Sequence, residues 1–486
     1  MPSSARLDRP SVIGGFVPVL LANLVPLVGV VRLQWDPATL VTLYTLELLF
    51  SFPMAAARVL FAQRPPRTDT DAESSVLDVS SDLAEKRGSV RVASWLPPVY
   101  PRALPFASRT AVAAVQFVLV FGVVLSNVLD VTGVLSAPGV YPSLAALVVG
   151  QSVETWRDYF LGSEYADASP YSVVETPARR AFFLTAVLVG MPFIVAFGPG
   201  GVFVVLVAGK LLVEWSGYRA DRDGGGRLTA WLSGPDADEG DARDPVSVPD
   251  ADPDARVGTD DRAAVVTGLL YVLSRNAPFL AIPFLIVMLL TLTGLEGVVS
   301  PLLAIGSSLL VAVLYVTLLV AEVLEFYLQY GPIEYRRYGD RLVAVDTLVD
   351  EPQWETSIDV LRDVRVRQDR LADRLLGTRT VAVTTGVDDG SRERSLGPVA
   401  DPDALVAAFD LPVRTTDLEP LGRLPAAVVI VTLCGVAGAL VVLALDPSVA
   451  LGGLLFRVLF YGVFGLPIGA ILLRLIWDRS YPEPRD

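Results

Sequence analysis

Histidine is absent from the 486-residue sequence, and cysteine occurs only once, at Cys434. Without histidine, the chain cannot form imidazole zinc sites, Ser-His dyads or histidine general bases. A single cysteine excludes an intrachain disulfide and a cysteine zinc cluster. The sequence also lacks a Gly-x-x-x-x-Gly-Lys-Ser/Thr phosphate loop and a Gly-x-Ser-x-Gly elbow. We therefore expect no catalytic residues, no metal and no cofactor, and the sequence favours a protein that is not an enzyme.

Lysine is nearly absent as well, since Lys86 and Lys210 are the only two lysines. The chain has 53 acidic and 39 basic residues, which gives a formal net charge of −14. Extra carboxylates keep a protein hydrated and soluble in concentrated salt, so we interpret this composition as that of a halophilic archaeal protein. The negative charge also disfavours a nucleic-acid partner.

Apolar residues make up 52% of the chain, and the mean hydropathy is +0.51. This exceeds the apolar content of ordinary soluble domains. A membrane-spanning helix needs roughly 20 apolar residues, and about ten stretches approach that length. The sequence therefore predicts a mostly α, polytopic transmembrane protein of about ten spans with a small β domain. The predicted spans are Val12–Val31, Leu40–Phe61, Ala111–Leu129, Pro142–Leu161, Ala181–Phe197, Val202–Trp215, Ala277–Leu292, Pro301–Leu324, Ala426–Leu445 and Leu451–Leu475.

Arginine is distributed unevenly between the connections. It is absent from the turns at 130–141, 198–201, 294–300 and 446–450, and it occurs in the long loops and near both chain ends. The turn at 32–37 is an exception with one arginine, Arg32. Cytoplasmic loops carry the excess of basic residues. This distribution predicts a multi-pass protein of the cell membrane with both termini in the cytoplasm.

Composition divides the chain into five parts. Residues 218–262 contain DRDGGGR and DPVSVPDADPDAR, a composition too poor in apolar residues to form a core, so they are predicted to be an acidic disordered linker. The other parts are a six-span membrane domain at 1–217, a transmembrane helix pair at 263–327, a β domain at 328–412 and a C-terminal transmembrane helix pair at 413–486.

The β domain is predicted from alternation between apolar and polar residues, the signature of half-buried strands. We expect the valines to point inward and the arginines outward: Val364, Val366, Val381 and Val383 against Arg365, Arg367 and Arg379. Gly377 should end a short helix, and Asp401 should cap a second helix that starts at Pro402.

Residues 328–409 resemble a bacterial pleckstrin-homology-like domain. The resemblance is carried by YRRYGDRLVAVDTLVDEPQWETSID, by VRVRQDRLADRLLGTRTVAVTTG and by the late DPDALVAAF helix. It implies a scaffold or interaction module without constant catalytic residues. A small extramembrane β domain of no special family is the other interpretation of the same residues.

The N-terminal part resembles an archaeal and bacterial membrane family known only as a domain of unknown function. The similarity rests on LLANLVPLVGVVRLQWDPATLVTLYTLE and on SPYSVVETPARRAFF with the following GPGGVFVVLVAGKLLVEWSGYRAD, and it covers about 1–220. It implies no assigned activity.

Four polar residues inside predicted spans form the candidate intramembrane polar site: Asn23, Glu47, Lys210 and Glu214. Ionisable groups are costly inside a bilayer, so each is a functional candidate. Asn23 and Glu47 lie on adjacent helices, and Lys210 and Glu214 share a helix face at i,i+4 spacing. The alternative is that these groups only hold helices together.

Two functions from different classes follow. The first is a non-enzymatic membrane scaffold or regulatory protein in the lipid bilayer, whose cytoplasmic β domain binds a protein partner or a second copy of the chain. The alternative is a secondary transporter or channel that uses Glu47 and Asn23. Intramembrane hydrolysis is disfavoured because no histidine or cysteine pair is available.

Overall fold

The computed structural model forms two compact units. Unit 1 comprises residues 1–80 and 109–242, and unit 2 comprises residues 81–108 and 243–486. The predicted N-terminal domain at 1–217 is therefore interrupted, because residues 81–108 belong to unit 2. The structure describes residues 37–66, 82–114, 140–194, 198–223, 246–273, 301–385 and 392–420, with the single positions 117, 133, 134, 427, 431, 435 and 438.

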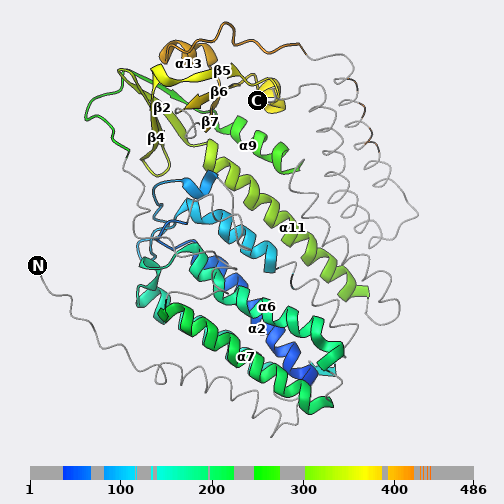
Figure 1. Cartoon of the computed structure of the whole chain (residues 1–486). Helices are drawn as coiled ribbons and strands as arrows, with labels where there is room; N and C mark the ends of the chain where they lie inside the picture. The colour runs from blue at the N-terminus through cyan, green and yellow to red at the C-terminus, as the bar shows by residue number, and fades with distance from the viewer. Residues whose placement is uncertain are drawn as a thin grey trace, which may run out of the picture. The chain divides into compact units, whose positions relative to one another are not determined.

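Unit 1 is helical, and helix α2 lies at its centre. Helices α5, α6 and α7 all contact α2. Figure 1 shows α6 and α7 beside α2. The shared apolar core includes Leu40, Leu48, Leu184 and Leu206. The described elements are α2 (Pro37–Val59), α5 (Val140–Glu154), the π-helical segment η4 (Thr155–Leu161), the 3-10 turn η5 (Glu164–Ala166), α6 (Pro170–Ile194) and α7 (Gly198–Asp223).

The prediction of about ten membrane spans was wrong. Within the described ranges, Thr39–Val59 is the one helical stretch long and apolar enough to cross a membrane, and half of it is buried inside the protein. Apolar composition alone does not separate a spanning helix from the core helix of a compact unit. The predicted spans Val12–Val31, Ala277–Leu292 and Leu451–Leu475 lie outside the described residues, as do nearly all of Ala111–Leu129 and Ala426–Leu445.

Two helices also differ from their predicted bounds. Helix α6 starts at Pro170 and not at Ala181, so it includes Glu175 and two arginines of the predicted loop. Helix α7 continues to Asp223, beyond the predicted end at Trp215. A helix continues past its apolar stretch wherever polar side chains find partners on neighbouring helices.

Unit 2 contains two antiparallel sheets, with helices and short helical turns around them. The four-stranded sheet has the order β1-β2-β3-β4, and the three-stranded sheet has the order β5-β6-β7. The strands are β1 (Ala255–Gly258), β2 (Ile333–Tyr338), β3 (Arg341–Asp346), β4 (Glu351–Ser357), β5 (Arg362–Val366), β6 (Arg379–Thr385) and β7 (Arg392–Val399). The described helical elements that bear on the argument are η2 (Asp82–Glu85), α9 (Asp261–Tyr271), α11 (Pro301–Tyr330), α12 (Leu371–Leu376) and α13 (Pro402–Ala408), with the short turns η3 (Pro101–Ala103) and η8 (Ile358–Val360).

Both sheets share one apolar core. Leu342 of β3, Val381 of β6 and Leu396 of β7 are fully buried in it. Leu405 and Phe409, from α13 and the residue that ends it, are buried in the same cluster. Helix α13 therefore packs against the core that the two sheets share.

Strand β1 lies inside the segment that was predicted to be a disordered linker. Ala255 pairs with Arg337 and Gly258 pairs with Glu334 of β2. Directly after β1, the Asp260 carboxylate caps α9 by accepting a hydrogen bond from the Ala263 amide at 2.8 Å. The linker prediction was wrong for these residues, because strand pairing with a distant part of the chain orders a segment with little apolar content of its own.

Helices α9 and α11 stand between β1 and β2 in the chain and pack against each other (Figure 1). A Cβ atom at Gly268 of α9 would come within 2.9 Å of the Phe326 ring of α11. This close approach requires glycine. Nearby, the rings of Tyr271 and Phe326 lie 5.7 Å apart.

The inward orientation of the β-domain valines is confirmed. Val381 and Val383 are fully buried, and Val364 and Val366 pack against the same core. The outward prediction was too simple for two arginines, as the side chains of Arg367 and Arg379 are only partly exposed and are held by protein groups. Arg367 pairs with Asp369 at 2.9 Å, and Arg379 donates to the Thr416 carbonyl at 2.8 Å.

Two local predictions in the β domain are also confirmed. Gly377 ends α12 in the left-handed conformation with φ 75°. Asp401 caps α13 by accepting a hydrogen bond from the Ala404 amide, with Pro402 in the first turn. The assignment of this domain to the pleckstrin-homology-like family stays a prediction.

Candidate functional site: a buried ion-pair cluster and a cavity

Glu47 lies in the core of unit 1, at the meeting point of three helices. Its side chain is buried on α2, and Lys210 of α7 donates a hydrogen bond to its Oε2 atom at 2.6 Å. Arg180 of α6 places Nη1 3.6 Å from the Oε1 atom of Glu47. The Lys210 ammonium also lies 4.3 Å from the centre of the Tyr44 ring, a cation–π distance. Glu47 therefore has two cations from two neighbouring helices.

The structure brings together two of the four predicted site residues, in a pairing that the sequence did not predict. The sequence predicted that Lys210 faces Glu214 on its own helix, which stays a prediction, and the structure shows Lys210 paired with Glu47 on another helix. Asn23 lies outside the described residues, and so does the side chain of Glu214. Arg180 was missed, because the sequence placed it in a loop before the predicted start of the helix at Ala181.

The neighbouring Arg179 belongs to a second polar contact on the same helix. Its guanidinium binds the carboxylate of Glu175 and donates to the Ser216 hydroxyl of α7 at 2.5 Å. The Arg179 side chain is buried. Buried charges are expensive unless they are paired. The cluster around Glu47 and the contacts of Arg179 together pair the buried charges of α2, α6 and α7. This arrangement fits a structural role that holds three helices in register.

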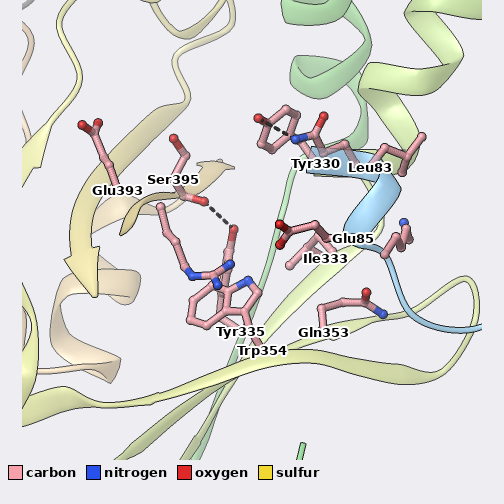
Figure 2. A pocket seen from close by; sticks show the side chains of 12 residues that line it. Leu83, Glu85, Tyr330, Ile333, Tyr335, Gln353, Trp354, Glu393 and Ser395 are labelled. Carbon is pink, nitrogen blue, oxygen red and sulfur yellow. Dashed lines mark hydrogen bonds between the residues drawn. The ribbon is translucent and has the colours of Figure 1, made fainter. Parts of the chain in front are cut away.

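Unit 2 contains a cavity of about 440 Å³ that is lined by residues of both sheets. Its volume falls within the usual range for ligand-binding pockets. Figure 2 shows Glu85 of η2 facing Tyr335 and Trp354 from the opposite wall. The lining residues come from η2, α11, β2, β4 and β7 and their ends: Leu83, Glu85, Lys86, Gln329, Tyr330, Ile333, Tyr335, Gln353, Trp354, Glu393, Arg394 and Ser395.

Tyr335 connects the two sheets beside this cavity. Its hydroxyl donates to the Ser395 carbonyl at 3.2 Å (Figure 2). It also accepts from the Gly397 amide at 3.0 Å. Burial raises the pKa of Tyr335 to about 12. The ring of Tyr335 also lies 6.4 Å from that of Trp354. The hydroxyl therefore remains protonated at neutral pH and fixes β2 against β7.

Trp354 and Arg394 form a stacked pair in the cavity wall. The guanidinium carbon of Arg394 lies 4.7 Å from the centre of the Trp354 ring. The preceding residue, Glu393, pairs with Arg365 of β5 at 3.2 Å. Stacked aromatic and guanidinium groups offer a wide, partly polar contact surface with little conformational freedom.

The wall contributed by η2 is fastened to the β domain through Lys86. Its ammonium pairs with the fully buried carboxylate of Asp346 and also donates to the Leu328 carbonyl at the end of α11. Burial lowers the pKa of Lys86, and the Asp346 carboxylate acts against that shift. The other oxygen of Asp346 accepts from the Leu348 and Val349 amides, at 2.7 and 3.1 Å.

A second contact fixes the chain directly after Lys86. The Arg87 amide donates to the Gln353 side chain at 2.8 Å, and the Gln353 amide group donates back to the Arg87 carbonyl at 3.2 Å. Sequence reasoning missed this wall, because it assigned 81–108 to the N-terminal domain. The pairing depends on residues far apart in the chain, and no local pattern could have shown it.

No cluster of three or more histidine, cysteine, aspartate or glutamate side chains suited to a metal ion occurs in the part of the chain that the structure describes. The cavity wall itself carries Glu85 and Glu393, and Glu393 already pairs with Arg365.

Residues 5–229 match the model of a family of unknown function (DUF6498). This confirms the resemblance of the N-terminal part to an uncharacterised family. The matched range ends before β1, so the cavity lies mostly outside it. No curated protein and no solved structure matches the chain.

Proposed function

We propose that this chain, whose N-terminal part matches the model of a family of unknown function, is a non-enzymatic scaffold or regulatory protein at a membrane. In this proposal, the cavity of unit 2 binds a segment of a protein partner. The observation that carries the proposal is the cavity of about 440 Å³ with a stacked Trp354–Arg394 pair in its wall.

The state of the lining groups supports binding more than catalysis. The Tyr335 hydroxyl, the Lys86 ammonium and the Glu393 carboxylate each contact another protein group. Proton transfer needs a group that can reach a substrate atom, and these groups are already engaged. Tryptophan, tyrosine and arginine are enriched among the residues that dominate protein–protein binding.

The distribution of side chains in unit 1 supports attachment to a membrane. Charged residues lie in its interior, with Glu47, Arg179 and Lys210 largely buried. Large apolar side chains are exposed on its outer helices, among them Phe182, Val189 and Phe193 of α6 and Val204 and Leu212 of α7. Charged groups that face inward beside apolar groups that face outward are typical of helices in contact with lipid. Lipid contact is therefore part of the proposal.

Transport through unit 1 is the second function to test, since a buried glutamate with two cations can also serve an ion pathway. The contacts favour the structural role, because both carboxylate oxygens of Glu47 already face Lys210 or Arg180. Flux of protons and monovalent ions into vesicles that contain the purified full chain discriminates between the two functions. Robust flux would contradict the scaffold proposal.

Partner binding in the cavity is tested by photo-crosslinking in native membranes. A photoreactive amino acid at Ser395, which lines the cavity, is compared with one at Glu355, an exposed residue of β4 outside the lining. We expect a discrete adduct from position 395, which disappears when Trp354→Ala is combined with it. Equal adducts from both positions, or none from position 395, would contradict the proposal.

A further inference from the structure

A short hairpin in unit 2 displays apolar side chains to the surroundings. The Val90 amide donates to the Val99 carbonyl and the Val99 amide donates to the Val90 carbonyl, both at 2.8 Å. We call residues 90–99 the Trp95 hairpin. In its loop, Val92 is 69% exposed and Trp95 is 70% exposed. A paired backbone thus presents a tryptophan and a valine outside the core.

The hairpin lies in the basic part of an acidic chain. Between Lys86 and Arg109 the sequence has no aspartate or glutamate, although the whole chain carries a net charge of −14. Lys86 is neutralised by Asp346, and Arg102 stacks on the Tyr100 ring at 4.5 Å. Arg91 is exposed beside Val92. The hairpin and its flanks therefore carry a local positive charge.

We infer that the Trp95 hairpin inserts into the headgroup region of an anionic lipid surface. Tryptophan prefers the membrane–water interface, because its ring is apolar and its N–H group forms hydrogen bonds. Basic residues beside it are attracted to anionic headgroups, and guanidinium binds phosphate with two hydrogen bonds. The charge of the hairpin complements such a surface, and its exposed Val92 adds apolar contact.

Salt limits the range of the electrostatic attraction. At 1 M salt the Debye length is about 3 Å, so only direct contact between Arg91 and a phosphate group contributes. The apolar contacts of Trp95 and Val92 are not screened. The inference extends the proposed function, because it adds lipid contact through unit 2, and it does not depend on what the cavity binds.

The experiment uses the full chain reconstituted in vesicles of phosphatidylcholine with phosphatidylglycerol, in which the acyl chains are brominated near the headgroups. Bromine quenches tryptophan fluorescence on contact, and the signal of Trp95 is the difference between the wild type and Trp95→Phe. The matched control is the signal of Trp354, obtained from Trp354→Phe in the same way.

We expect strong quenching of the Trp95 signal and none of the Trp354 signal. Val92→Asp should reduce the quenching of Trp95 at least twofold, and vesicles without phosphatidylglycerol should quench it less. An unquenched Trp95 signal would overturn the inference, while quenching of Trp156 and Trp215 would still report lipid contact of unit 1. Iodide in the water quenches exposed tryptophans. If Trp95 is protected from iodide in native membranes but not in vesicles that contain this chain as the only protein, the inference would also be overturned, in favour of an acidic protein partner.

Discussion

Lys210 of α7 binds Glu47 of α2 at 2.6 Å in the buried interior of unit 1. The same carboxylate faces Arg180 of α6 at 3.6 Å. Three helices are therefore joined at one anion. An ion pair of this kind is sensitive to the loss of a single partner, because the remaining charge stays buried without compensation.

Lys210→Met should destabilise unit 1 by about 3–5 kcal/mol, because it removes the closer of the two cations that face Glu47. The double variant Glu47→Leu with Lys210→Met should recover part of the loss, since it removes both members of the closer pair and keeps a similar volume, while the Arg180 guanidinium loses its contact with Glu47. Thermal unfolding of the purified chain in detergent measures both effects. A double variant that is less stable than Lys210→Met would show that the pair is not mainly structural.

Lys86→Met should detach the η2 wall from the β domain of unit 2. It leaves the fully buried Asp346 carboxylate without the Lys86 ammonium, at a cost of about 3–5 kcal/mol. The matched control is Arg341→Met, which removes an exposed pair with Glu355 at 3.7 Å and should cost at most about 1 kcal/mol. Limited proteolysis at Arg87 and Arg91 reports the detachment. Equal cleavage in both variants would contradict the proposed role of Lys86.

The buried hydroxyl of Tyr335 should make unit 2 less stable at alkaline pH. Burial raises its pKa to about 12, above the ordinary value of about 10. The Tyr335 hydroxyl therefore loses its proton at lower pH in the unfolded chain than in the folded chain. The contribution of this hydroxyl to the free energy of unfolding falls as the pH rises from about 10 to about 12. A shift of two pKa units corresponds to roughly 2–3 kcal/mol. Denaturant unfolding of the wild type and Tyr335→Phe at pH 8 and pH 11.5 isolates the effect.

At pH 8, Tyr335→Phe should be less stable than the wild type by roughly 1–3 kcal/mol, because the Ser395 carbonyl and the Gly397 amide lose their partner. At pH 11.5 the difference should shrink or reverse. A difference that is the same at both pH values would show that the Tyr335 hydroxyl ionises at its ordinary pKa.

Local signals in the sequence predicted local structure correctly. Gly377 ends a helix because it adopts positive φ without strain, and Asp401 caps the next helix with its own side chain. Contacts between distant parts of the chain left no such signal. Ala255 pairs with Arg337, and Lys86 reaches Asp346, although neither pairing produces a periodic pattern that can be seen in the sequence.

The candidate site was predicted in part for the same reason. Glu47 and Lys210 were identified because a charge inside an apolar stretch is conspicuous. Their mutual pairing depends on how α2 and α7 pack, which the sequence alone did not specify. The cavity depends on residues 81–108 joining unit 2, so a fragment of residues 328–412 would lack both this wall and β1.

A fully buried valine and a partly exposed arginine lie on neighbouring strands of the β domain. Val383 of β6 is fully buried, whereas the Arg365 side chain of β5 is 37% exposed and pairs with a Glu393 side chain that is 42% exposed. Val383→Asp removes an apolar side chain worth about 1.5–3 kcal/mol and adds an unpaired buried charge, so unit 2 should unfold. Arg365→Ser should cost at most about 1 kcal/mol.

Binding through the cavity should depend on Trp354 more than on any neighbouring exposed residue. Trp354→Ala removes the ring that stacks under Arg394 and lies beside Tyr335, so both lose a contact surface. Truncation of a residue that dominates an interface typically costs at least about 2 kcal/mol, roughly a 30-fold loss of affinity.

Leu348→Ala is the control, because Leu348 is 49% exposed and lies outside the cavity lining. The measurement is the affinity of the full chain for the partner identified through position 395, with thermal unfolding of each variant to verify the fold. Equal affinities for a folded Trp354→Ala and Leu348→Ala would show that the partner does not bind in the cavity.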